Sequence, residues 1–375
     1  MTPRSDAAAV DGSQSETGSP DDAGSGDVAA LPEDGALADA ATADGANTDA
    51  SIAAPIVAPN ERWTWVSIDG MRCGNGQPTG VAVNLTNRSR RVMVIVQGGG
   101  ACWDVATCFV LRSAANLESG YGAAQFESER VNLESAALLD RRAANNAFAD
   151  ASYVFVPYCT GDMHSGTRVM RYEALGMTRD VHHVGARNMD ALMPRLQATF
   201  ASADKLWLYG ISAGGYGVIF NWLRFSQAFR SARVDALSDC GVPVTPPDGR
   251  YATWVRTWGS QLPPGCADCD RNLTSVLLAQ LAAHRTSRFG QLAFTDDQVL
   301  RTFYGLGPAD FAPLVRTLHT RLSTEPNART FVVTSDAHVM AGAINTTRTA
   351  DGTVLGPWLQ QWATDSPMWA SHAPY

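Results

Sequence analysis

The chain has 375 residues, and its 37 acidic and 29 basic side chains give a net charge of −8 with histidine neutral. No stretch reaches the roughly 18 consecutive apolar residues that a membrane-spanning helix needs, so no membrane span is expected. The charges of the folded part give no marked positive excess, so nothing supports nucleic-acid binding.

Residues 1–60 form an acidic tract made mostly of Ala, Asp, Gly, Ser, Thr and Pro. The tract has eleven acidic residues against one basic residue, Arg4, and no aromatic side chain, which leaves the rest of the chain near +2. So little apolar surface and so much like charge predict a disordered linker. We expect one folded domain over residues 61–375, with order beginning near Trp63.

Five short β-rich runs alternate with helical patterns through the folded part. The runs are residues 92–96, 153–156, 206–208, 234–237 and 330–333. Between them, residues 188–200 place apolar side chains at helical spacing. This pattern predicts a doubly wound α/β fold, with a mostly parallel central sheet and helices on both faces. Chemistry gathers at the carboxyl ends of such strands, so the residues after each run are the candidates.

Two candidate loops follow the first two runs. The first is glycine-rich, Gly98-Gly99-Gly100-Ala101-Cys102-Trp103, and a phosphate cradle is disfavoured because no helix-opening Gly-Lys-Ser/Thr follows. Trp103 is equally compatible with core packing and with a wall for an acyl or sugar group. The second loop contains Asp162 and His164, which lack further ligands for a metal site. We expect this pair to brace its loop or to contact substrate.

The third run leads into Gly210-Ile211-Ser212-Ala213-Gly214, a G-x-S-x-G motif followed by an apolar helical pattern at 218–225. A strand, a sharp turn and a helix form a nucleophile elbow, and small residues on both sides allow the strained turn. We therefore predict Ser212 as a nucleophile. The amides of Gly99 or Gly100 and of Ala213 are the expected oxyanion hole.

Chain order narrows the choice of base, because α/β-hydrolases place the acid and then the histidine after the nucleophile. Of the later histidines, only His338 closely follows a strand-like run; His284 and His319 lie in helical patterns, and His372 lies near the end. His338 is therefore the predicted base. The acid remains open among Asp239, Asp296 and Asp297.

Seven cysteines predict an oxidising compartment, some disulfides and at least one free thiol. Cys266 and Cys269 follow a Pro-Pro-Gly loop and no second C-x-x-C exists, so a local disulfide or two separate bridges are favoured over zinc. We expect a secreted or surface-attached protein. The acidic tract resembles the stalks of bacterial lipoproteins or exported enzymes, although no secretory signal is visible in the residues as written.

The motifs in combination resemble the pectin acetylesterase family, which includes the animal Notum deacylases. They are GGGACW at 98–103, YCTGDMHSG at 158–166, GISAGG at 210–215, SDCG at 238–241 and SDAH at 335–338. The resemblance runs from about Trp63 to about Met340. It implies an α/β-hydrolase-fold serine esterase that needs no cofactor or metal, with Ser212 as nucleophile and His338 as base.

The resemblance also indicates roles for the three aspartates that remain candidates for the acid. It places the acid on Asp297, in a segment that reads Phe294-Thr295-Asp296-Asp297-Gln298-Val299. It makes Asp239 a residue that shapes the substrate pocket, although Cys240 stands where the family has a serine.

The expected function is therefore a monomeric serine carboxylic-ester hydrolase that removes acetyl groups from an acetylated polysaccharide such as pectin. Two alternatives remain: a deacylase or lipase-like enzyme on another ester, and a non-catalytic carbohydrate- or protein-binding relative. The second is disfavoured because nucleophile, base and glycine loop are all intact. Trp103, Tyr158 and Tyr216 would favour a short acyl group if their side chains point into the pocket.

Overall fold

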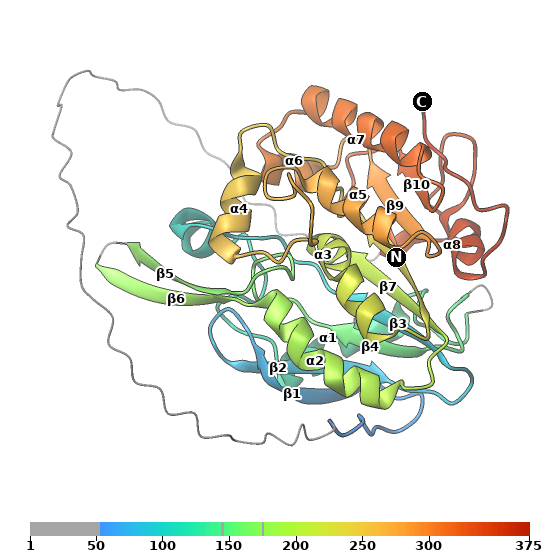
Figure 1. Ribbon diagram of the computed structural model, residues 1–375, viewed down its shortest axis with the longest axis horizontal. Coiled ribbons are helices and arrows are strands. Elements are labelled where there is room, and N and C mark those ends of the chain that lie inside the picture. Colours follow the sequence, from blue (N-terminus) through green and yellow to red (C-terminus); the bar gives the residue numbers. More distant parts are fainter. Residues whose placement is uncertain (1–52, 144–145, 175) are drawn as a thin grey trace, which may run out of the picture. The chain divides into compact units, whose positions relative to one another are not determined.

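The computed structural model describes residues 53–143, 146–174 and 176–375 (Figure 1). Most of the acidic tract, residues 1–52, lies outside the described residues, so the linker remains a prediction there. The last part of the tract is described. The Ile56 side chain is 3% exposed and packs in the main core, and its N–H donates to Thr199 Oγ1 over 2.7 Å. The folded part therefore includes Ile56, several residues before Trp63.

Two truncations should differ in stability. Deleting residues 1–52 should leave the melting temperature and the activity unchanged, whereas deleting residues 1–58 also removes the buried Ile56. Burying an isoleucine contributes about 1.5–3 kcal/mol, which for a domain of this size corresponds to a loss of roughly 2–5 °C, since the entropy of unfolding is about 2.1 cal/mol/K per residue. Calorimetry of the full chain and both truncations checks this. A loss already seen with the shorter deletion would mean that the acidic tract stabilises the domain.

The centre of the fold is an eight-stranded sheet in the order β1-β2-β4-β3-β7-β8-β9-β10. Its strands are β1 (Thr64–Arg72), β2 (Pro78–Asn84), β3 (Arg91–Val96), β4 (Ser152–Val156), β7 (Lys205–Ile211), β8 (Arg233–Asp239), β9 (Phe289–Phe294) and β10 (Ala328–Val333). The six strands β4, β3, β7, β8, β9 and β10 pair in parallel with their neighbours in the sheet. Strands β1 and β2 are antiparallel and lie at one edge. All five β-rich runs of the sequence are strands of this sheet, which confirms the predicted α/β class.

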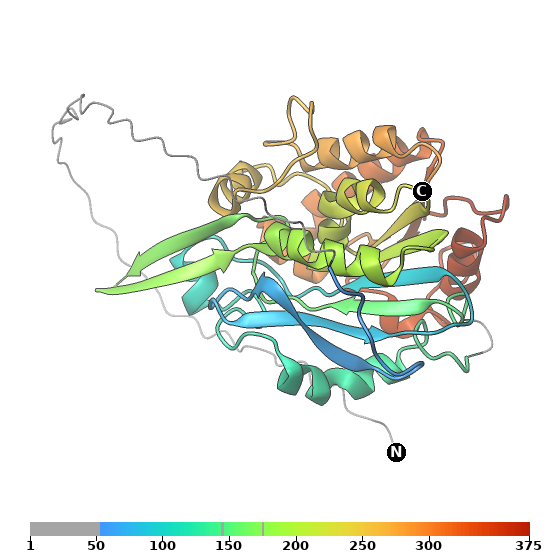
Figure 2. The same ribbon diagram turned by 60° about the horizontal axis from the view of Figure 1, so that its bottom comes forward.

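Helices cover both faces of the sheet. They are α1 (Ala123–Ser135), α2 (Gly185–Thr199), α3 (Ala213–Ala228), α4 (Arg250–Trp258), α5 (Leu273–Ala283), α6 (Gln298–Tyr304), α7 (Pro308–Ser323) and α8 (Leu355–Ala363), with short turns η1 (Ala106–Val110) and η2 (Ala341–Ala343). Side chains of β3 alternate between two cores: Val94 belongs to the core that contains side chains of α2, α3, α5 and α7, and Ile95 belongs to the core that contains side chains of α1 and α8. Figure 2 shows α1 and α2 on opposite sides of the sheet. This two-sided burial explains why the runs are continuously apolar.

A two-stranded hairpin, β5 (Arg168–Ala174) and β6 (Met177–His183), extends away from the body of the domain (Figures 1 and 2). Tyr172 and Val181 of the hairpin belong to the same buried apolar cluster as Cys102 and Cys108. The hairpin was not expected from the sequence, because its outer part is polar and has no continuous apolar run.

Three disulfides hold the loops around the sheet: Cys73–Cys159, Cys102–Cys108 and Cys266–Cys269. Of the two arrangements expected for the C-x-x-C pair, the structure has the local bridge, and the seventh cysteine, Cys240, is free and buried. Disulfides in this number are typical of proteins in oxidising compartments. Among the described helices, none is both long and apolar enough to cross a membrane.

Candidate active site

The G-x-S-x-G motif lies at the junction of β7 and α3, as its local pattern predicts. Ser212 occupies this junction with φ 55° and ψ −120°, a conformation that non-glycine residues rarely adopt. The flanking glycines allow it: a Cβ on Gly210 would lie 2.1 Å from the Gly214 carbonyl oxygen, and one on Gly214 would lie 2.0 Å from that of Val96. The turn therefore requires glycine at both positions.

The other candidate residues of the active site follow neighbouring parallel strands and therefore lie at the same edge of the sheet. The glycine loop follows β3, Asp239 ends β8, Asp297 follows β9 and His338 follows β10. Because β3, β7, β8, β9 and β10 are adjacent in this order, their carboxyl ends surround Ser212. Residues up to 240 positions apart in sequence thus share one site.

Ser212, His338 and Asp297 form a hydrogen-bonded chain. His338 Nε2 lies 2.8 Å from Ser212 Oγ, and His338 Nδ1 lies 2.7 Å from Asp297 Oδ2. Asp297 is fully buried, and its other oxygen accepts from the Leu300 N–H over 3.0 Å, capping α6. With Asp297 accepting from Nδ1–H, the Nε2 lone pair faces the serine hydroxyl.

The other two aspartates that the sequence left as candidate acids bond elsewhere. Asp296 Oδ2 accepts from the Thr295 hydroxyl over 2.7 Å. Asp239 is fully buried, and its carboxylate accepts from the Tyr209 hydroxyl and from the Met340 N–H, each over 2.8 Å. Burial raises the pKa of Asp239. Neither carboxylate bonds to His338, and neither lines the cavity beside Ser212.

The glycine loop passes directly over the elbow. A Cβ on Gly98 would lie 2.2 Å from the Ile211 carbonyl oxygen, and Gly100 has φ 73° and lines the cavity beside Ser212. Within the described residues, the amides of Gly99, Gly100 and Ala213 have no hydrogen-bond acceptor. Free N–H groups at this position are available to an anionic oxygen.

A small apolar cavity of about 30 Å³ opens beside Ser212. It is lined by Gly100, Ala101, Met163, Ser212, Ala213, Tyr216, Trp254, Val299, Leu300, Phe303 and Tyr304. Helix α6, which begins directly after Asp297, contributes four of these residues. The sequence analysis missed this wall and Trp254; proximity of α6 to Asp297 was an available signal, but nothing local marks Trp254.

Of the three aromatic residues considered as pocket walls, only Tyr216 lines the cavity. Trp103 packs against Trp254 with ring centroids 5.1 Å apart, so it supports the wall from behind. Tyr158 is fully buried, and its hydroxyl accepts from the Met163 N–H over 2.9 Å.

Asp162 and His164 brace the loop after β4. The buried Asp162 carboxylate accepts from the Thr160 hydroxyl and from the amides of His164, Gly166 and Gly185. His164 Nε2–H donates to the Gln97 carbonyl over 2.9 Å, which ties this loop to the glycine loop. Burial lowers the pKa of His164, which favours the neutral ring. Neither side chain lines the cavity, so the brace is the role their contacts support.

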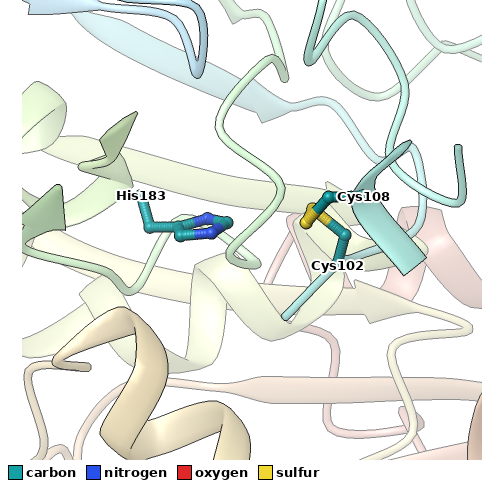
Figure 3. A group of neighbouring side chains, drawn as sticks. All are labelled: Cys102, Cys108 and His183. Atoms are coloured by element: carbon teal, nitrogen blue, oxygen red, sulfur yellow. A yellow bond between two sulfur atoms is a disulfide. The ribbon is translucent and has the colours of Figure 1, made fainter. Parts of the chain in front are cut away.

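Cys102, Cys108 and His183 are the one cluster among the described residues with the spacing of metal ligands (Figure 3). The two sulfurs are bonded to each other. His183 Nδ1–H donates to the Thr160 carbonyl over 2.8 Å, and Nε2 accepts from the Tyr172 hydroxyl over 2.9 Å. All candidate donor atoms of the cluster are therefore engaged, and the cluster is structural.

The mostly parallel sheet and the elbow serine at its carboxyl edge define an α/β-hydrolase-fold protein. Residues 64–262 match the family model described as Pectinacetylesterase. The chain therefore belongs to the pectinacetylesterase family. This match includes the glycine loop and Ser212 but ends before Asp297 and His338, which the fold brings to Ser212.

Individual relatives are distant. A palmitoleoyl-protein carboxylesterase Notum of Schmidtea mediterranea is 22% identical over 52% of this chain and 40% of the relative. Pectin acetylesterase 11 of Arabidopsis thaliana is 28% identical over 46% of this chain and 45% of the relative. Human Notum is 25% identical over 45% of this chain and 34% of the relative. The chain thus spans less than half the length of these relatives.

Proposed function

We propose that this protein is a serine carboxylic-ester hydrolase that removes acetyl groups from an acetylated polysaccharide such as pectin. The observation that carries the proposal is the hydrogen-bonded chain Ser212–His338–Asp297, which lies beside unpaired amides and a small apolar cavity. Membership of the pectinacetylesterase family and its esterase-named relatives supports the reaction class.

The proposed reaction has two steps. Ser212 Oγ attacks the ester carbonyl while His338 Nε2 takes the hydroxyl proton, and the protonated imidazole then gives this proton to the departing alcohol oxygen. Asp297 holds the ring and stabilises its positive charge. In the second step, His338 takes a proton from water, the resulting hydroxide attacks the acyl-enzyme, and the acid leaves as Ser212 regains its proton.

The oxyanion of each tetrahedral intermediate would accept hydrogen bonds from the amides of Ala213 and of Gly99 or Gly100. One such donor contributes about 3 kcal/mol to lowering the barrier. The helix dipole of α3, which begins at Ala213, adds to the positive potential at this position.

The size of the cavity supports acetate over a long acyl group. It offers about 30 Å³, whereas an apolar cavity that binds benzene measures about 150 Å³. A methyl group is the acyl substituent that fits this volume. The two Notum relatives are named for a palmitoleoyl ester, and so long a chain would require the α6 wall to move.

Acyl-chain selectivity tests this part of the proposal. We expect p-nitrophenyl acetate to be hydrolysed with a kcat/KM at least tenfold above that of the octanoate, because each unfavourable or absent methylene contact changes the barrier by about 1–3 kcal/mol. Acetylated pectin should release acetate, which an enzymatic acetate assay measures. Preference for the octanoate, with no acetate released from any acetylated polysaccharide, would favour a deacylase acting on another ester.

A fluorophosphonate probe separates the enzyme from a non-catalytic binding relative. An activated serine reacts covalently with the probe, whereas the serine of a non-catalytic relative that only binds carbohydrate or protein does not. We expect stoichiometric labelling, with the modified peptide containing Ser212.

The disulfides support a protein that is secreted or held at the cell surface, and a monomer remains the proposed state.

A further inference from the structure

Asp239 contacts both segments that present the reacting groups. It is the last residue of β8 and is fully buried. Its backbone carbonyl accepts the Ser212 N–H over 2.7 Å, at the centre of the elbow. Its carboxylate Oδ1 accepts the Met340 N–H over 2.8 Å, two residues after His338. One residue therefore bonds to the nucleophile segment through its backbone and to the base loop through its side chain.

The base loop has a bend that needs external support. Val339, between His338 and Met340, has φ 61°, a left-handed conformation that is unusual for a β-branched residue. Such backbone persists only where surrounding contacts hold it. The contacts that follow Val339 are the Met340 N–H bond to Asp239 and the fully buried Met340 side chain. The position of His338 thus depends on how Met340 is held.

Tyr209 holds the other oxygen of the same carboxylate. Its hydroxyl donates to Asp239 Oδ2 over 2.8 Å, and it lies on β7 three residues before Ser212. The carboxylate is therefore fixed by donors from two sides, one on the nucleophile strand and one on the base loop. A hydrogen bond to a carboxylate is shorter and stronger than a neutral one, which suits a rigid connection.

We propose that Asp239 is a positioning residue that holds the Ser212 elbow and the His338 loop at the separation that proton transfer needs. The inference rests on the proposed esterase function and goes beyond it. Asp239 lies outside the cavity lining, and Asp297 bonds His338 directly, so Asp239 acts through Met340 and Ser212. It replaces the expectation from the sequence that Asp239 shapes the substrate pocket.

The test compares two buried aspartates of the same strand. Asp239→Ala should lower kcat for p-nitrophenyl acetate by about 10- to 100-fold with KM changed less than about threefold, since a small misplacement of catalytic groups costs up to about 10² in rate. Asp239→Asn keeps an acceptor for the Met340 N–H and should retain kcat within about fivefold.

Asp235→Ala is the matched control. Asp235 is also fully buried on β8, but it pairs with Lys205 and Arg233 at the far end, so this change should lower the melting temperature and leave kcat near wild type.

Labelling by the fluorophosphonate probe gives a second readout. Its rate at Ser212 should fall in Asp239→Ala in parallel with kcat, and it should stay normal in Asp235→Ala. If Asp239→Ala does not fold, the double variant Asp239→Leu/Tyr209→Phe carries the test, because it removes the carboxylate and the hydroxyl together and leaves one fewer unpaired polar group. It should show the same loss of kcat.

The outcomes are distinct. Normal kcat in folded Asp239→Ala, or in the double variant if that one carries the test, would overturn the positioning role, and so would an equal loss in Asp235→Ala. A raised KM with unchanged kcat would instead return Asp239 to substrate binding. If the wild-type protein shows no hydrolysis that depends on Ser212, the proposed esterase function fails before this inference is reached.

Discussion

Ser212→Ala should lower the turnover of p-nitrophenyl acetate by about 10⁴-fold or more and leave the fold intact. The three groups of a triad act as a unit, so removing the nucleophile leaves only the contribution of binding and of the oxyanion donors. Among the described residues, the Ser212 side chain forms a hydrogen bond only with His338, so its loss should change the melting temperature little. Steady-state kinetics and calorimetry of the purified variant provide both measurements.

Ser323→Ala is the matched control for this experiment. Ser323 is exposed at the end of α7, and its hydroxyl donates to the His319 carbonyl. We therefore expect kcat to stay at the wild-type value and the fluorophosphonate probe to label the protein still. A folded Ser212→Ala protein with near-normal ester hydrolysis would overturn the proposed mechanism as a whole.

Asp297→Asn should be nearly as damaging, with a loss of about 10⁴-fold in kcat. The geometry gives a specific reason. Asp297 Oδ1 caps α6 by accepting from the Leu300 N–H, so an asparagine at this position keeps its oxygen on Leu300 and turns its NH₂ toward His338 Nδ1. The ring must then accept at Nδ1 and carry its proton on Nε2, where it has no lone pair for the Ser212 proton.

Two neighbouring substitutions make the comparison specific to Asp297. Asp296→Asn should retain kcat within a few fold, because its carboxylate accepts from the Thr295 hydroxyl, whereas the ring of His338 bonds to Asp297 and Ser212. Asp239→Asn should show the small loss expected of a positioning residue. If Asp239→Asn were inactive and Asp297→Asn active under one assay, the acid would be assigned to the strand β8 instead.

Several features of this fold could be predicted because their physical cause is local. The runs that became β3, β4, β7, β8 and β10 are apolar on both faces since both faces are covered by helices. Strand β9 was not predicted, because Gly290 and Gln291 interrupt its apolar run. The structure gives the reason for the glycine: a Cβ on Gly290 would lie 2.3 Å from Leu237 Cδ1.

The residues of the candidate active site also fall into two groups, those that a local pattern predicts and those that only tertiary contacts identify. Ser212 and its glycines were predicted from the five-residue motif G-x-S-x-G and the strand and helix patterns on either side of it, and His338 was selected by chain order and the strand before it. The acid could not be chosen from residues alone, since Asp239, Asp296 and Asp297 all lie at or just after the end of an apolar, strand-like run. What distinguishes Asp297 is a 2.7 Å contact with a residue 41 positions away.

The sequence by itself thus determined the α/β class, the elbow and the presence of disulfides with a free thiol, because backbone sterics, strand burial and cysteine number are properties of short segments or of composition. Only the tertiary structure decided which carboxylate meets His338, that Trp254 and α6 close the cavity, that Ile56 belongs to the core, and that Asp239 connects the two loops. These outcomes depend on the order of strands in the sheet, which brings distant segments to one edge. No pattern within a single segment encodes that order.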